Sequence, residues 1–176
     1  MENKLTIFKP FFEEPNKRFS IRELSRNLKI NHTTVRQYLN RMMREKYLSL
    51  KNEGVYSFYS LVISKKTLNL KLYYNLEKIR ESRIIEDLEK EFDLPVIVLF
   101  GSYASAADDQ DSDLDVCLIS NINKEFFPEK YERKLNRKIS IHHFNKSSWE
   151  KAKKLNPGLV NNICNGIVLS GELEVL

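Results

Sequence analysis

The chain has few of the residues that mark a disulfide-built or membrane-spanning protein. Its 176 residues include only two cysteines, Cys117 and Cys164, and we expect core thiols in a reducing compartment rather than a disulfide or a metal pair. It has no run of eighteen apolar residues, which excludes a transmembrane helix. Its N-terminal segment lacks the pattern of a secretory signal. We therefore expect a cytoplasmic protein that does not use a membrane.

Acidic charge is scarce in the first part of the chain. Residues 1–66 carry 14 Lys and Arg against six Asp and Glu, a net charge of +8, whereas residues 67–176 carry 15 against 18, a net charge of −3. The length suits two small domains. A basic half beside a slightly acidic half indicates two domains and places any nucleic-acid contact in the first.

One stretch carries the strongest functional signal in the chain. Pro95 opens the apolar run Val96–Phe100, which predicts a buried strand, and Gly101 allows a tight turn after it. Ser102 stands where a helix N-cap is expected, before residues 103–107. The free N–H groups at a helix start suit a phosphate, so this turn is a candidate phosphate site.

Paired carboxylates follow on a second predicted strand, residues 114–119. Because side chains alternate along a strand, Asp113 and Asp115 share one face, and Cys117 lies on that face too. Two such carboxylates can bridge hard cations, and two metal ions about 3.5–4 Å apart can clamp the attacking and leaving oxygens of a phosphoryl displacement. The carboxylates expected to form only a solvated acidic loop are Asp108, Asp109 and Asp111.

The turn and the Asp-x-Asp strand together resemble the nucleotidyltransferase superfamily related to DNA polymerase β, over about the C-terminal half of the chain. The resemblance implies Mg²⁺ or Mn²⁺ at Asp113 and Asp115, and a nucleoside triphosphate, expected to be ATP, at Gly101, Ser102 and Ser112. The implied reaction transfers a nucleoside monophosphate to an acceptor hydroxyl and releases pyrophosphate. Some small members are antitoxins paired with a helical toxin of the HEPN type, which is the implied partner here.

The sequence departs from that family at three positions. Ser105 and Ala106 stand where the family often has Arg and Gly, and Ala106 is expected to suit a helix. The family's third carboxylate, a general base and metal ligand on a later strand, is replaced by Ser140. Ser140 and His142 are expected to face the site from residues 137–144. Either His142 takes over as catalytic base, or the domain has lost turnover and kept nucleotide binding.

The basic half is predicted to contain three helices and a hairpin. A first apolar helix is followed by a second that starts at the capping box of Ser20 and Glu23, and by a third that Asn31 caps. Alternation over residues 47–50 and 55–61, with a glycine turn between them, predicts the hairpin. This order resembles a winged helix-turn-helix domain.

A winged helix over residues 1–62 would place the start of its third helix in the major groove of double-stranded DNA. Arg36 and Gln37 are able to read guanine or adenine edges, and a protein-binding winged helix is the alternative that the +8 charge disfavours. The expected DNA-binding residues, the last three at phosphates, are His32, Thr33, Thr34, Arg36, Gln37, Arg41, Arg44 and Lys51.

Residues 63–92 are predicted to be linker helices that break near Ser82, and residues 93–176 to be the nucleotidyltransferase domain. Two late helices are expected, one capped by Ser147 and one starting at Pro157. The predicted fold class is α+β: a winged helix-turn-helix, a linker helix, and a small mixed β-sheet flanked by helices. The linker carries an apolar stripe at helical spacing, called the linker stripe below, which is either a homodimer interface or part of the core. The linker stripe comprises Leu68, Leu72, Leu76 and Ile79.

The sequence thus predicts a DNA-binding nucleotidyltransferase that uses a metal-bound nucleoside triphosphate. Two alternatives remain open. One is a transcription regulator with a weakened or inactive nucleotide-sensing domain, because Ser140 replaces a carboxylate. The other is an antitoxin that regulates its own promoter and modifies a helical toxin.

Overall fold

The protein is described by a computed structural model, which covers the backbone of residues 2–174 and the side chains of residues 5–174. It divides into two compact units, one ending at Lys71 and one beginning at Leu72. Helix α4 (Lys65–Ser82) starts in the first unit and continues into the second. Among the described residues, no helix combines the length and hydrophobicity that a membrane span requires.

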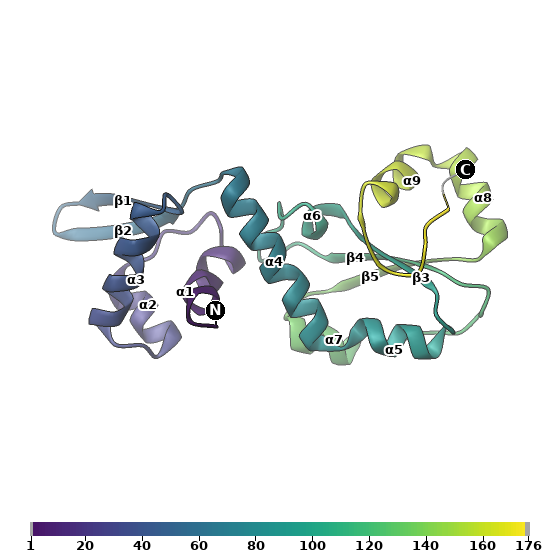
Figure 1. The fold of residues 1–176 in the computed structure, drawn as a ribbon, viewed down its shortest axis with the longest axis horizontal. Coiled ribbons are helices and arrows are strands. Elements are labelled where there is room, and N and C mark those ends of the chain that lie inside the picture. Colours follow the sequence, from purple (N-terminus) through teal and green to yellow (C-terminus); the bar gives the residue numbers. More distant parts are fainter. Residues whose placement is uncertain (1, 175–176) are drawn as a thin grey trace. The chain divides into compact units, whose positions relative to one another are not determined.

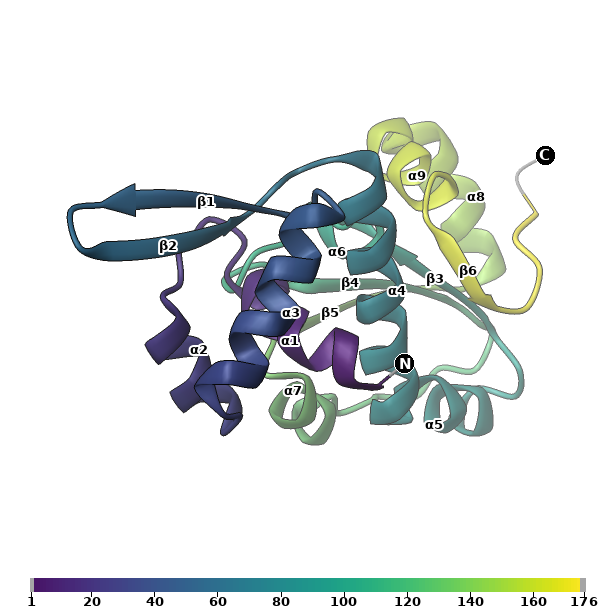
Figure 2. The same cartoon turned by 60° about the vertical axis from the view of Figure 1, so that its left-hand side comes forward.

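The N-terminal unit contains three helices followed by an antiparallel hairpin that extends beyond them (Figure 2). Ser20 Oγ accepts a hydrogen bond from the Glu23 N–H, and Asn31 Oδ1 accepts one from the Thr33 N–H at 2.7 Å, so both predicted caps are confirmed. The elements are α1 (Glu2–Glu13), α2 (Ile21–Leu28), α3 (His32–Arg44), β1 (Leu48–Glu53) and β2 (Tyr56–Leu61).

The hairpin turn is shorter than predicted. Strand β1 continues through Lys51 to Glu53, which pairs with Tyr56, so the loop consists of Gly54 and Val55 alone. Gly54 has φ +60°, a conformation that glycine adopts without steric cost. The polar residues that suggested a longer loop are instead exposed strand residues of a two-stranded sheet.

The C-terminal unit is built on a four-stranded mixed sheet, as predicted, with the strand order β5-β4-β3-β6 (Figure 1). Strands β4 and β5 are parallel, and the other pairs are antiparallel. The strands are β3 (Val96–Phe100), β4 (Leu114–Ile119), β5 (Ile139–Phe144) and β6 (Ile167–Ser170). The further helices are α5 (Ile84–Glu91), α6 (Gly101–Ala104), α7 (Glu129–Leu135), α8 (Lys146–Leu155) and α9 (Pro157–Cys164).

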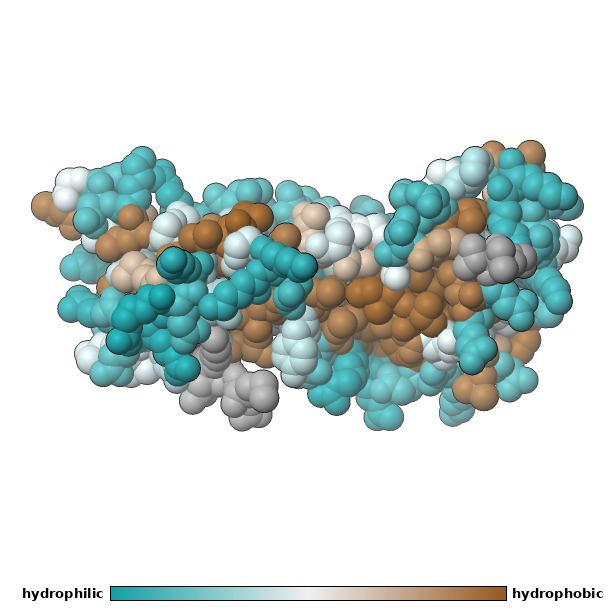
Figure 3. All heavy atoms as spheres, turned by 45° about the horizontal axis from the view of Figure 1, so that its top comes forward, coloured by the Kyte–Doolittle hydropathy of each residue, from teal (hydrophilic) through white to brown (hydrophobic). Residues whose placement is uncertain are grey.

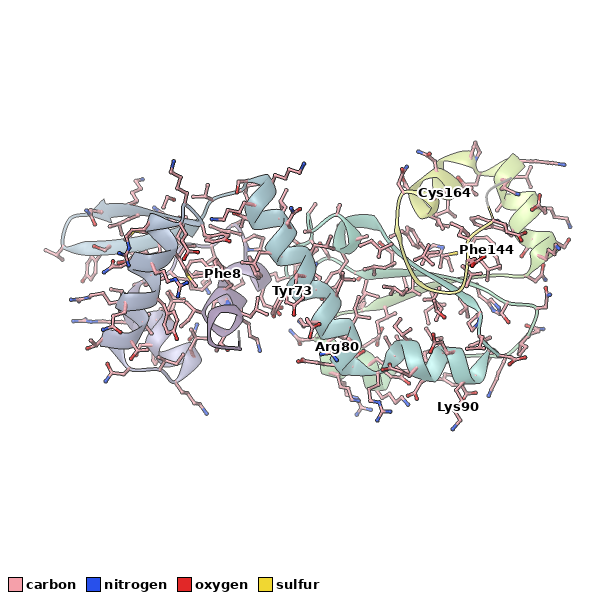
Figure 4. The ribbon with its side chains drawn as sticks, in the orientation of Figure 1. Phe8, Tyr73, Arg80, Lys90, Phe144 and Cys164 are labelled. Carbon is pink, nitrogen blue, oxygen red and sulfur yellow. The ribbon has the colours of Figure 1, made fainter. Side chains whose placement is uncertain are left out.

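Helices pack on both faces of this sheet: α5 and α7 lie on one side, and α8 and α9 on the other (Figure 1). The first core contains Leu114, Val116 and Leu118, as their alternation on β4 predicts. The second contains Cys117, and the side chains of Phe144 and Cys164 lie on its side (Figure 4). Burial raises the pKa of Cys117 to about 12, so this thiol is protonated and inert at neutral pH.

The helices α8 and α9 do not hide the apolar interior of the unit completely. Figure 3 shows hydrophobic side chains gathered over the middle of this unit, with hydrophilic side chains around them. Val168 on the edge strand β6 is 46% exposed. This face of the sheet is therefore partly accessible at its β6 edge.

One prediction about the helices was wrong, and one helix was missed. Helix α7 was not predicted, because the signal from Tyr131 and Leu135, buried one turn apart, is too short to stand out. Helix α8 is capped by Asn145, whose Oδ1 accepts from the Ser148 N–H, and not by Ser147. Leu155 is 83% exposed because it ends α8 next to the turn into α9.

The linker stripe also differs from its prediction. The leucines of α4 are half-buried, and the most buried row of this helix lies beside them. That row repeats every four residues, which is one face of a helix, and three of its members are polar. It comprises Thr67, Lys71, Asn75 and Ile79.

Candidate functional site

The sheet register brings the predicted site residues together on one face. Asp115 on β4 pairs with Phe100 on β3 and with Ser140 on β5. Two residues further along, Cys117 pairs with His142. Asp115, Ser140 and His142 therefore lie on the α8–α9 side of the sheet, as their alternation predicts. Ser140 is the immediate cross-strand neighbour of the second carboxylate.

The Gly101 turn lies against that carboxylate. Gly101 has φ +73°, and a Cβ atom added there would lie 2.4 Å from Asp115 Oδ2. Only glycine therefore permits the close approach of the turn to Asp115. Helix α6 starts at Gly101 with Phe100 as its N-cap and ends at Ala104. The prediction that Ser102 caps a helix through residue 107 was wrong, because the tight turn itself begins the helix.

The two departures beside this turn have structural roles. The Ser105 hydroxyl donates to the carbonyls of Gly101 and Ser102 at 3.2 and 3.1 Å. It is a second donor to these carbonyls, which also accept from the N–H groups of Ser105 and Ala107. Ala106 lies beyond the helix with φ 56°, in the left-handed region that favours glycine. The expectation that Ala106 suits a helix was therefore wrong.

The paired carboxylates differ in their environments. Asp113 is exposed, whereas Asp115 is half-buried between two strands. Burial raises the pKa of the Asp115 carboxyl, Asp113 raises it further, and His142 acts in the opposite direction. A cation next to both carboxylates would stabilise their charged forms.

The donor atoms of the site suit a metal ion that is held together with a substrate. In the part of the chain that the structure describes, no group of three or more His, Cys, Asp or Glu side chains is arranged to bind a metal. Mg²⁺ commonly takes one or two carboxylates and completes its shell with water and substrate phosphates. Asp113 and Asp115, beside the Gly101 turn, fit that pattern and not a cage made by protein alone.

A serine–histidine pair completes the site. Ser140 Oγ and His142 Nε2 lie 3.3 Å apart, and both side chains are half-buried. The Phe100 ring contacts the His142 ring edge to face, with 5.3 Å between centroids, and so orients the imidazole. His142 is placed to take a proton from Ser140, or from a hydroxyl bound beside it.

A buried network holds the loop between the turn and the carboxylates. Asp108 accepts from Arg137 Nη2 at 3.2 Å and from Asn75 Nδ2 at 2.8 Å. Arg137 also donates to the carbonyls of Asp109 and Ser112, and Asn75 donates to the carbonyl of Tyr103. Asp108 is 1% exposed, so its prediction as a solvated residue was wrong. A pairing 29 residues apart in the sequence leaves no local pattern, which is why the sequence did not reveal it.

An open cleft of about 680 Å³ adjoins Asp113. Arg133 and Lys138 line it, and both are exposed. Ser112, predicted to bind the nucleotide, also lines the cleft, but its hydroxyl donates to Asp109 Oδ1 at 2.9 Å. Neither of these two cations was predicted to belong to the site, because cations on a helix end and a loop are common.

The predicted DNA-binding residues lie on α3 and on the hairpin. All of them are exposed except Thr34, which is half-buried. Two of the cations predicted at phosphates have protein partners: Arg41 Nε donates to Glu45 at 2.8 Å, and Lys51 pairs with Glu53 at 3.1 Å. Arg36 and Gln37 point from the first turns of α3 without such an ion pair among the described contacts.

The fold and the site define a nucleotidyltransferase domain, in which a carboxylate pair on one strand faces a glycine turn on the next. Residues 82–172, just over half of the chain, match the polymerase beta nucleotidyltransferase family, and the chain belongs to that family. Its members generally use a nucleoside triphosphate and a divalent metal ion.

Among solved structures, the following is similar to part of the chain. It is a possible transcriptional regulator from Methanosarcina mazei Go1, with 20% sequence identity and a TM-score of 0.34 over 51% of this chain and 78% of that one. At this level the likeness carries no functional argument. No curated protein matches the chain.

Proposed function

We propose that the protein is a DNA-bound nucleotidyltransferase. It binds a nucleoside triphosphate with a divalent metal ion and passes a nucleoside monophosphate to a hydroxyl group. The observation that carries this proposal is the contact of the Asp115 carboxylate with the Gly101 turn. That contact puts metal-binding oxygens and a phosphate-binding turn at one point.

Each residue of the site has a role in this proposal. Asp113 and Asp115 hold the metal ion, which when bound polarises the phosphate and neutralises its charge. Gly101 and Ser102 bind the triphosphate. His142 accepts the proton of the attacking hydroxyl.

Binding is tested by calorimetric titration of ATP, GTP, CTP and UTP in Mg²⁺. One nucleotide is expected to bind at one site per chain, and Asp113→Asn is expected to weaken that binding. Asp93→Asn is the matched control, because Asp93 is an exposed carboxylate that does not line the cleft. If no nucleotide binds in Mg²⁺ or Mn²⁺, the proposal is wrong.

A second candidate function is a transcription regulator that senses nucleotide without turnover, and the place of Ser140 beside Asp115 favours it. DNA affinity would then change with bound nucleotide, while no pyrophosphate is released. Measurement of pyrophosphate release together with DNA binding separates the two candidates. Release that depends on Asp113 rejects this second candidate.

The DNA contact is assigned to α3. The +8 charge of residues 1–66 supports it, as do the three helices and the hairpin, which suit a winged helix-turn-helix. Arg36→Ala is expected to reduce affinity for a selected operator more than for unrelated DNA. Lys9→Ala removes the same charge from the exposed side of α1 and serves as the control. Equal losses for both variants would contradict a reading role of Arg36.

A further inference from the structure

We propose that Ser140 is itself a nucleotidyl acceptor, so that the protein attaches a nucleoside monophosphate to its own chain. This inference rests on the proposed function and names the acceptor: a serine hydroxyl of the same site. It follows from the position of Ser140 and from the base that Ser140 contacts.

Ser140 and His142 have the arrangement of an activated nucleophile. The Ser140 hydroxyl donates to His142 Nε2 across 3.3 Å when the imidazole proton is on Nδ1. Nucleophile–base pairs are often this loose before substrate binds. The edge-to-face contact with Phe100 holds the ring in place. The pair thus has a nucleophile, a base and a group that orients the base.

The pair is also next to the reacting phosphate. Ser140 is the direct cross-strand partner of Asp115, and adjacent strands lie about 4.8 Å apart. Asp115 in turn contacts the Gly101 turn. A phosphate bound between the turn and the carboxylates is therefore one strand away from the Ser140 hydroxyl, which is accessible because its side chain is half-buried.

The reaction balances without a further reactant. The proton of Ser140 Oγ passes to His142 Nε2, and Oγ forms a bond with the α-phosphorus of the nucleoside triphosphate. The bond from the α-phosphorus to the oxygen that bridges the α and β phosphates breaks, and pyrophosphate leaves. The product is a phosphodiester between Ser140 and the nucleoside.

The test is intact-mass spectrometry of the full chain after incubation with ATP and Mg²⁺, followed by peptide mapping. One nucleoside monophosphate per chain is expected, located at Ser140. Ser140→Ala should abolish labelling, and His142→Ala should slow it by about 10²-fold or more. Ser170→Ala removes a serine from the opposite edge strand of the same sheet and should label like the unaltered protein.

Ser140→Asp is a second test, because it adds a carboxylate to the site and does not only remove a hydroxyl. It puts a carboxylate beside Asp115, so it should abolish self-labelling and lower the Mg²⁺ concentration needed for nucleotide binding. A protein that binds Mg-ATP but stays unlabelled, or that is labelled at another residue, overturns the inference and leaves the proposed function intact. A protein that binds no nucleotide overturns both.

Discussion

At the residue scale, the Asp115 carboxylate is costly to the folded protein. Asp115 is half-buried, with Asp113 close enough to raise its pKa further. A raised pKa means that the ionised carboxylate is less favourable in the folded chain than in the unfolded chain. Such a residue destabilises the metal-free protein at neutral pH, so packing does not explain its presence.

Replacing this carboxylate should therefore stabilise the metal-free protein. Asp115→Asn is expected to raise the melting temperature in EDTA at pH 7 and to remove the further rise that Mg-ATP produces. Because the folded-state pKa is raised, the gain should be complete above that pKa and should vanish as the pH falls below about 4, where the unfolded carboxyl protonates. Scanning calorimetry from pH 4 to 8 measures it. A lower melting temperature at pH 7 would contradict the explanation.

At the element scale, two glycines with similar φ angles allow the effect of backbone strain to be measured separately from the effect of a side-chain clash. Gly101 has φ +73° and Gly54 has φ +60°, but only at Gly101 would a Cβ atom meet a neighbour. Alanine at either position costs about 1–2 kcal/mol of backbone strain. Gly101→Ala also displaces Asp115, so it should abolish Mg-ATP binding, whereas Gly54→Ala should leave it unchanged. Urea denaturation and calorimetry measure both effects.

The buried network is the second prediction at this scale. Arg137 and Asp108 have side chains only 2% and 1% exposed, and removing one partner of a buried pair costs about 3–5 kcal/mol. Arg137→Met should therefore lower the free energy of unfolding by that amount. Arg80→Met is the matched control: Arg80 pairs on the surface with Glu77 and is 69% exposed, so about 1 kcal/mol or less is expected. Equal losses in urea denaturation would contradict the role assigned to the network.

For the whole molecule, the charge division predicts two binding activities that respond differently to salt. DNA binding by the basic N-terminal unit releases counterions, so its affinity should fall at least about tenfold between 50 and 200 mM salt. Nucleotide binding at Asp113 and Asp115 involves few phosphates and should change much less. Fluorescence anisotropy for DNA and calorimetry for nucleotide, on the full chain, measure the two. Equal salt dependence would contradict the division.

The sequence predicted those elements whose signals are local. Val96–Phe100 and the strand that starts at Leu114 follow from apolar runs and alternation, and Ser20 and Asn31 follow from capping chemistry. It did not predict α7, the short hairpin turn or the burial of Asp108. The burial of Asp108 depends on Arg137, 29 residues away, and a propensity or a periodicity contains no information about such a partner. The signals for α7 and for the end of β1 are local, but the first is too short and the second too polar to stand out.

The sequence by itself determined the chemistry of the site: Gly101, the paired carboxylates Asp113 and Asp115, and Ser140 in place of a third carboxylate. Alternation along a strand was enough to put these side chains on one face. Only the tertiary structure decided which strands are neighbours, and hence that Ser140 lies beside Asp115. Strand order and register arise from the packing of both sheet faces, which no single segment encodes.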